Sequence, residues 1–171
     1  MERFHATLLS VMREARSLGV RGREARVRAA MAEAFDLPAM ARIAVGPAWT
    51  GFSPGQQEAV ATAFADWSIA TYAGRFDGFS GESFSTSGTQ ALQNGDQMVR
   101  TTLNRPRDQP VQLNYLVRNT PRGPRVVDVY LTGTISELAS RRSEFAAVLR
   151  DGGPDRLVAE LRRRTAELLR G

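Results

Sequence analysis

The 171-residue sequence has no cysteine and no lysine, and its one histidine is His5. Without cysteine the protein has no disulfide, no thiolate metal site and no cysteine nucleophile. A single histidine near the start of the chain is too few ligands for a protein metal site. Because lysine is missing, all 23 cationic side chains are arginine, which we attribute to the base composition of the genome.

Long apolar runs are missing as well, so we expect no transmembrane helix. Met1–Arg3 is not followed by the apolar core of a signal peptide. If the protein is exported, we expect this sequence to be the mature form with an added methionine. The apolar content of 42% and the charged content of 24% are ordinary for a globular protein, and the length predicts a single domain over residues 1–171. The net charge of +5 favours anionic surfaces without naming a partner.

Apolar residues recur at helical spacing over residues 1–76. The strongest helix start is Ser53-Pro54-Gly55-Gln56, where Ser53 caps the N-terminus and Gln56 stands at the capping-box position. The helix that follows is apolar on two sides, which indicates an enclosed helix. The predicted helices of this half are Phe4–Leu18, which ends at Gly19, Val20–Phe35, Leu37–Val45 and Pro54 to about Phe76.

Apolar and polar residues alternate over residues 82–132, as in β-strands. Asn94-Gly95 is a typical hairpin turn, and proline-rich turns separate the later strands. In the last strand we expect Val127, Val129 and Leu131 to share one face. The pattern predicts an antiparallel meander of four strands, Glu82–Ala91, Gln97–Leu103, Val111–Val117 and Arg125–Thr132.

Helical spacing returns over residues 136–170, after Gly133 breaks the last strand. We predict two C-terminal helices, the second from Pro154 to Leu169. The turn out of the sheet lays the first of them across it, and such a corner encloses an apolar volume. The sequence therefore predicts an α+β fold in which N-terminal helices and a long central helix pack on the four-stranded meander around an internal apolar pocket.

The sequence offers little catalytic chemistry. Residues 51–55 match the pattern G-x-S-x-G by letter, but Pro54 lacks the backbone N–H that an oxyanion hole needs and no strand precedes Ser53. There is also no glycine-rich phosphate loop. We predict no enzymatic activity, no cofactor and no metal, and instead a non-catalytic site for an apolar ligand. A small enzyme with a carboxylate dyad is a weaker hypothesis.

One long motif resembles a known family. Phe35-Asp36-Leu37-Pro38-x-Met40-Ala41-Arg42-x-Ala44-x-Gly46-x-x-Trp49 is similar to the hallmark of the toluene-tolerance, or Mla-type, family of periplasmic lipid-binding proteins. The match continues through Thr71–Phe76, Asp128-Val129, Ser136 and Arg142–Phe145, and it spans about Phe4 to Leu169. The turn Phe76–Glu82 is most similar to the branch of this family that is associated with hopanoid biosynthesis.

The resemblance implies helices on a four-stranded antiparallel sheet, with lipid tails in a pocket between them. It implies a soluble periplasmic carrier, auxiliary to an ABC transporter, that passes a phospholipid or hopanoid between transport components of the inner and outer membranes. It implies neither catalysis nor nucleic-acid binding. Many family members carry Asn-Tyr-Arg where this chain has Ser140-Arg141-Arg142. The resemblance therefore does not indicate which side chain closes that end of the corner.

Tail burial favours a lining of apolar and aromatic side chains, because each buried CH₂ contributes roughly 0.8 kcal/mol. The predicted lipid-binding residues are Met40, Ile43, Phe64, Trp67, Tyr72, Leu113, Tyr115, Val117, Val129, Leu131 and Phe145. The alternative function is a basic module that binds nucleic acid or an anionic membrane through its arginine-rich helices. The second helix has no aromatic residues interleaved for base stacking, which weakens the nucleic-acid version.

Overall fold

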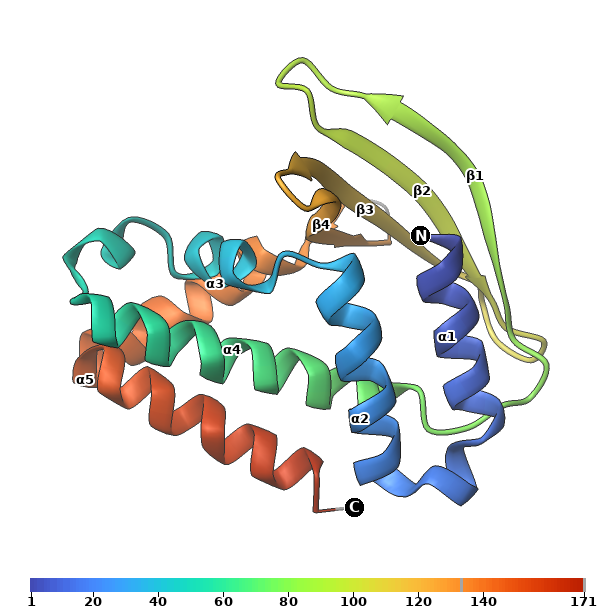
Figure 1. The fold of residues 1–171 in the computed structure, drawn as a ribbon, viewed down its shortest axis with the longest axis horizontal. Helices are drawn as coiled ribbons and strands as arrows, with labels where there is room; N and C mark the ends of the chain where they lie inside the picture. Colours follow the sequence, from blue (N-terminus) through green and yellow to red (C-terminus); the bar gives the residue numbers. More distant parts are fainter. Residues whose placement is uncertain (133, 171) are drawn as a thin grey trace.

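A computed structural model describes residues 1–132 and 134–170 as a group of helices beside a curved antiparallel sheet (Figure 1). The helices are α1 (Glu2–Arg13), α2 (Ala15–Ala34), α3 (Leu37–Val45), the 3₁₀ helix η1 (Gly46–Gly51), α4 (Pro54–Arg75) and α5 (Glu137–Leu168). The strands are β1 (Ser83–Ala91), β2 (Gln97–Asn104), β3 (Val111–Thr120), β4 (Gly123–Leu131) and β5 (Ile135–Ser136). The predicted α+β class is confirmed. No helix of the described ranges is long and apolar enough to cross a membrane.

The sheet is a meander in the order β1-β2-β3-β4-β5, with each strand antiparallel to its neighbours. The four predicted strands are present. The fifth, β5, pairs Tyr130 with Ser136 and Leu131 with Ile135 at the end of β4. The sequence analysis missed it because two residues are too few to show a period of two.

Strand β4 contains a bulge that changes which residues face the helices. Leu116 pairs with Asp128 and Val117 pairs with Val126, so Val127 is an extra residue in the ladder. Directly paired residues lie on the same face of a sheet, and a bulge interrupts the alternation. Val126 therefore shares a face with Val129, and the prediction that placed Val127 there was wrong.

Helix α4 begins at the predicted capping box. The backbone N–H of Gln56 donates to Ser53 Oγ at 3.2 Å, and the backbone N–H of Ser53 donates to Gln56 Oε1 at 2.9 Å. Both donors would otherwise lack a partner within the helix. Ser53, the serine of the G-x-S-x-G letters, therefore serves as a helix cap.

Helices α2 and α5 each contain a break at a glycine residue. Gly19 (φ 64°) interrupts α2 where the first predicted helix was expected to end, and a second break that the sequence analysis did not predict lies at Glu14 (φ −98°, ψ 14°). Gly153 (φ 72°) interrupts α5 just before Pro154. Positive φ values favour glycine, which has no Cβ to clash with the backbone. The two predicted C-terminal helices are thus the two halves of α5.

Asp128 of β4 holds the corner between the sheet and α5. Its Oδ1 accepts the backbone N–H of Val129 at 2.7 Å and that of Leu138 at 3.3 Å, and its Oδ2 accepts the hydroxyl of Ser136. The Ser136 hydroxyl in turn accepts the backbone N–H of Ala139 at 3.0 Å and caps α5. Asp128 is only 6% exposed, so one buried carboxylate joins β4, β5 and the first turn of α5.

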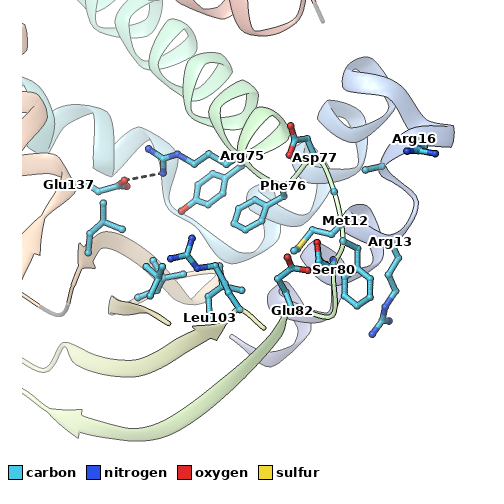
Figure 2. A pocket seen from close by; sticks show the side chains of 18 residues that line it. Met12, Arg13, Arg16, Arg75, Phe76, Asp77, Ser80, Glu82, Leu103 and Glu137 are labelled. Carbon is cyan, nitrogen blue, oxygen red and sulfur yellow. Dashed lines mark hydrogen bonds and ion pairs between the residues drawn. The ribbon is translucent and has the colours of Figure 1, made fainter. Parts of the chain in front are cut away.

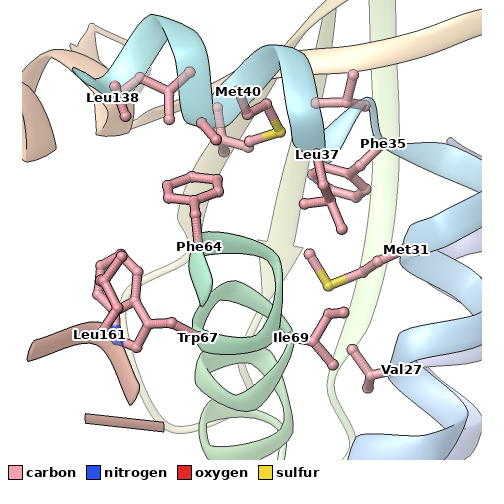
Figure 3. Close-up of a cluster of buried hydrophobic side chains, with 14 of the residues drawn as sticks. Val27, Met31, Phe35, Leu37, Met40, Phe64, Trp67, Ile69, Leu138 and Leu161 are labelled. Carbon is pink, nitrogen blue, oxygen red and sulfur yellow. The ribbon is translucent and has the colours of Figure 1, made fainter. Parts of the chain in front are cut away.

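The helices pack on one another around a dense apolar core (Figure 3). All five α-helices contribute buried side chains to this core, as do β3 and β4. Within the helical layer, Phe64 and Trp67 of α4 lie against Phe145 of α5, with ring centroids 6.0 to 6.4 Å apart. The labelled members in Figure 3 are Val27, Met31, Phe35, Leu37, Met40, Phe64, Trp67, Ile69, Leu138 and Leu161. This helical layer is therefore filled by its own side chains.

We expect Asp128→Ala to lower the free energy of unfolding by about 2–3 kcal/mol, because three donors in a buried corner lose their acceptor. Urea denaturation followed by circular dichroism measures this change. Asp128→Asn keeps one acceptor oxygen and should cost less. Asp108→Ala, in the exposed turn after β2, is the matched control and should change stability by less than about 0.5 kcal/mol. A fully stable Asp128→Ala protein would contradict this role.

Candidate functional site

A cavity of about 830 Å³, the main cavity, opens between the sheet and the helices (Figure 2). Its walls come from the junction of α1 and α2, from the end of α4 with the turn that follows, and from β2, β3 and β4. The lining residues are Met12, Arg13, Ala15, Arg16, Tyr72, Arg75, Phe76, Asp77, Gly78, Phe79, Ser80, Glu82, Leu103, Arg105, Val111, Leu113, Leu131 and Glu137.

The floor of the main cavity is the sheet face that points toward the helices, here called the inner face. Leu103 pairs with Val111 and Leu113 pairs with Leu131, so apolar side chains from three strands lie together on this face. The opposite wall is Tyr72 of α4 with the adjoining Phe76, whose rings stack with centroids 5.7 Å apart. The floor and the opposite wall of the main cavity are therefore apolar.

Charged side chains also reach the main cavity. Arg13 lies over the ring of Phe79 with 5.1 Å between its guanidinium carbon and the ring centroid. Arg75 Nη1 is 3.3 Å from Glu137 Oε1, the dashed contact in Figure 2. An apolar floor with arginine and carboxylate groups beside it suits an amphipathic ligand, whose chain leaves water while its polar end keeps polar partners.

A second cavity, of about 380 Å³, lies at the other end of α1. Its apolar inner-face residues are Val99, Val117 and Val126, and Phe4 of α1 faces them. Arg3 of α1 and Glu33 of α2 line its edge, and their side chains form an ion pair at 2.6 Å. The other lining residues are Met1, Thr7, Ala30, Ala34, Gln97, Pro124 and Arg125.

His5 of α1 contacts the sheet between the two cavities. Its Nε2 shares a hydrogen bond with the hydroxyl of Tyr115 at 2.9 Å, and its ring stacks on Phe84 of β1 at 4.0 Å between centroids. His5 is 3% exposed and Tyr115 is 1% exposed. Its spacing from Leu8 and Met12, three and then four residues apart, was the sequence signal that His5 lies on a buried helical face.

Burial sets the protonation of these groups. It lowers the pKa of His5 to about 4, so the imidazole is neutral near neutral pH. It raises the pKa of Tyr115 and raises that of Tyr72 well above the usual value, so both phenols keep their protons. His5, Tyr72 and Tyr115 are therefore uncharged near neutral pH.

The structure separates the eleven predicted lipid-binding residues into groups. Tyr72, Leu113 and Leu131 line the main cavity, and Val117 lines the second cavity. Met40, Phe64 and Trp67 lie in the helical layer, around a cavity of only about 40 Å³ that Tyr72 also lines. The remaining four are Tyr115 and Val129, buried on the inner face, and Ile43 and Phe145, packed in the helical layer.

Several residues of the main cavity were not predicted. Met12 and Phe76 lie in predicted helices and Leu103 lies in a predicted strand, but the sequence carried no sign that these elements meet. Arg13, Arg75 and Glu82 gave no signal because charged residues are usually solvent-exposed. Only the way α1 and the turn after α4 fold back over the sheet brings them together.

Several arginines of the helix surfaces are paired with carboxylates. Arg28 contacts Glu24 and Asp66, and Arg163 contacts Glu160 and Glu167. Hydrogen bonds from Arg163 lower the pKa of Glu160 to about 2, which keeps that carboxylate charged. Such pairing leaves less free positive charge for nucleic acid than the sequence suggests. Within residues 1–132 and 134–170, no group of three or more His, Asp or Glu could hold a metal ion.

One protein-family model matches nearly the whole sequence. This model, described as MlaC protein, matches residues 2–163. The chain belongs to the MlaC family. The Mla-type resemblance of the motif at Phe35–Trp49 is thereby confirmed. Comparison with curated proteins gives no match.

A solved structure has the same fold as this MlaC-family chain. It is the phospholipid-binding protein from Ralstonia solanacearum in complex with a phospholipid, and it is 26% identical in sequence. The match covers 98% of this chain and 95% of that chain, with a TM-score of 0.84. The likeness therefore extends over all the helices and strands that form the main cavity.

The structure also shows what closes the corner where this MlaC-family chain has Arg141. The guanidinium carbon of Arg141 lies 5.0 Å from the ring centroid of Trp67, and Arg164 lies over the same ring at 5.7 Å. Glu144 pairs with both arginines. Cations over an aromatic face are attracted to it. This end of the helical layer is closed by two guanidinium groups stacked on Trp67.

We expect stability to fall with pH below about 6.5, because His5 takes up its proton less readily when buried than in the unfolded chain. Its folded pKa of about 4 lies below the ordinary 6.5, so stability is full above pH 6.5 and is lost progressively toward pH 4. Between pH 7 and pH 5 the loss should be about 2 kcal/mol.

The measurement is urea denaturation at several pH values for the wild type and for His5→Gln, which cannot titrate. The difference between the two proteins isolates His5 from the carboxylates. Parallel pH profiles for both proteins would show that His5 is not buried as described.

Proposed function

We propose that this protein binds a phospholipid, with its acyl chains in the main cavity and its headgroup at the charged edge. The observation that carries the proposal is the apolar floor of Leu103, Leu113 and Leu131 beside Arg13, Arg75 and Glu82. Membership of the MlaC family and the fold shared with a protein in complex with a phospholipid support it. Tyr72, Leu113 and Leu131 are the predicted lipid-binding residues that would contact the chains there.

The energetics favour retention of the ligand. Each buried CH₂ contributes roughly 0.8 kcal/mol, so one long chain contributes on the order of 10 kcal/mol before the costs of binding. Release into water would then be slow, and transfer would need a partner or an opening of the cavity. This is the behaviour of a carrier rather than of an enzyme.

We further propose that the protein carries its lipid through the periplasm between membrane-bound transport components of the inner and outer membranes. The resemblance to Mla-type carriers supports this role. A hopanoid is the second candidate ligand. The turn Phe76–Glu82, whose sequence is similar to the hopanoid-associated branch, contributes Phe76, Phe79 and Glu82 to the wall of the main cavity.

Organic extraction of natively purified protein, followed by mass spectrometry, tests this function. We expect about one lipid per protein, and the mass separates a phospholipid from a hopanoid. Leu113→Arg places a charge on the apolar floor and should lower the bound lipid at least about tenfold, because an unpaired charge is costly to bury.

Gln112→Arg is the matched control, since Gln112 is exposed on the other face of the same strand. It should bind as much lipid as the wild type. A lipid-free extract from the wild type, or equal loading of both variants, would count against the main cavity as the lipid site.

A further inference from the structure

We propose that the second cavity is a further site for an acyl chain, and that it joins the main cavity when Tyr115 turns away from His5. The ligand class is a long, unbranched hydrocarbon chain of an amphipathic lipid. This inference rests on the proposed lipid-binding function and extends it to a part of the fold on the other side of α1.

The first observation is that both cavities lie along one continuous sheet face. On β3 the inner-face residues follow one another as Leu113, Tyr115 and Val117, and the first lines the main cavity while the last lines the second. On β2, Leu103 lines the main cavity and Val99 the second. The same strands therefore form the floor of both cavities.

The second observation is that few side chains divide this face. On the sheet, Thr101, Tyr115 and Val129 occupy the inner-face positions between the two floors, and all three are buried. From α1, His5 meets Tyr115 through one hydrogen bond of 2.9 Å. Phe35, just after α2, packs on Tyr115 with ring centroids 6.5 Å apart, and Phe84 of β1 stacks on His5. The division is therefore made of side chains from the sheet, from α1 and from Phe35.

The third observation is that the dividing contact can open without exposing a charge in the interior. His5 and Tyr115 are both neutral, because burial lowers the pKa of the first and raises that of the second. Helix α1 also meets α2 through breaks at Glu14 and Gly19, where the chain leaves helical geometry. Such residues are where a hinge absorbs a change in backbone angles.

The size and chemistry of the second cavity fit a chain better than a headgroup. Val99, Val117, Val126 and Phe4 are apolar. Of the three charged residues in the lining, Arg3 and Glu33 pair with each other, and Arg125 donates to the backbone oxygen of Pro124. From Val111 to Val117 the inner face runs about 20 Å along β3, at roughly 3.4 Å per residue. A chain that enters at Val111 and passes Tyr115 would thus end in the second cavity.

The test uses phosphatidylglycerol that carries a diazirine near the end of one acyl chain. The wild type is loaded with it and illuminated, and the labelled residues are identified by mass spectrometry. We expect labels on Val99, Val117 or Ala34 in addition to the main cavity. Labels confined to main-cavity residues such as Met12, Phe76 and Leu103 would overturn the inference while leaving lipid binding intact.

A second measurement compares Val117→Phe with Leu116→Phe. Leu116 is the neighbour of Val117 on the opposite face of β3, so the two variants add the same ring to the same strand. Val117→Phe should reduce labelling of the second cavity at least fivefold and shift the natively bound lipids toward shorter chains. Leu116→Phe should do neither.

Equal labelling and equal chain lengths in both variants would also overturn the inference. If the wild type takes up no phosphatidylglycerol and shows no label anywhere, the proposed function itself fails and the inference falls with it. Failure of this inference and failure of the proposed function are therefore distinguishable, because only failure of the proposed function leaves the main cavity unlabelled.

Discussion

The structure depends on an uneven covering of the sheet by the helices. Helices α2, α3 and α5 contact the sheet at β4, whereas α1 reaches β1 and β3 through His5, which touches Phe84 and Tyr115. The helices otherwise pack on one another. An apolar sheet face that is covered at one edge and crossed by one short helix leaves space on both sides of that helix, and both cavities lie there.

The two layers of the fold differ in how they use apolar side chains. In the helical layer, Phe64, Trp67 and Phe145 fill the space themselves, and guanidinium groups from Arg141 and Arg164 close it. On the sheet side, Leu103 and Leu113 are only partly buried and face open volume. Apolar surface that the protein does not bury with its own residues is surface that a ligand can bury.

Local rules predicted most elements of this fold but not which of them enclose the cavity. The capping box at Ser53 and the hairpin at Asn94-Gly95 are decided by neighbouring residues, so the sequence shows them directly. The bulge at Val127 and the two-residue strand β5 depend on the pairing of strands, which periodicity does not record. The family resemblance gave the lipid class, and composition alone gave only an apolar ligand.

The same distinction explains why some of the predicted lipid-binding residues line a cavity and others lie in the packed helical layer. Trp67 and Leu113 look alike in sequence, each an apolar residue at the right spacing on a buried face. Trp67 faces a neighbouring helix that fills the space before it, and Leu113 faces the main cavity, with Tyr72 and Phe76 on the opposite wall. Trp67 and Leu113 therefore differ in what lies opposite them, and not in a property that the sequence shows. His5 shows the converse, since a polar residue near the start of the chain becomes the contact that fixes α1 against the sheet. A cavity in such a fold is therefore determined by the helix that covers it, and the position of α1 controls how much of the inner face is open to a ligand.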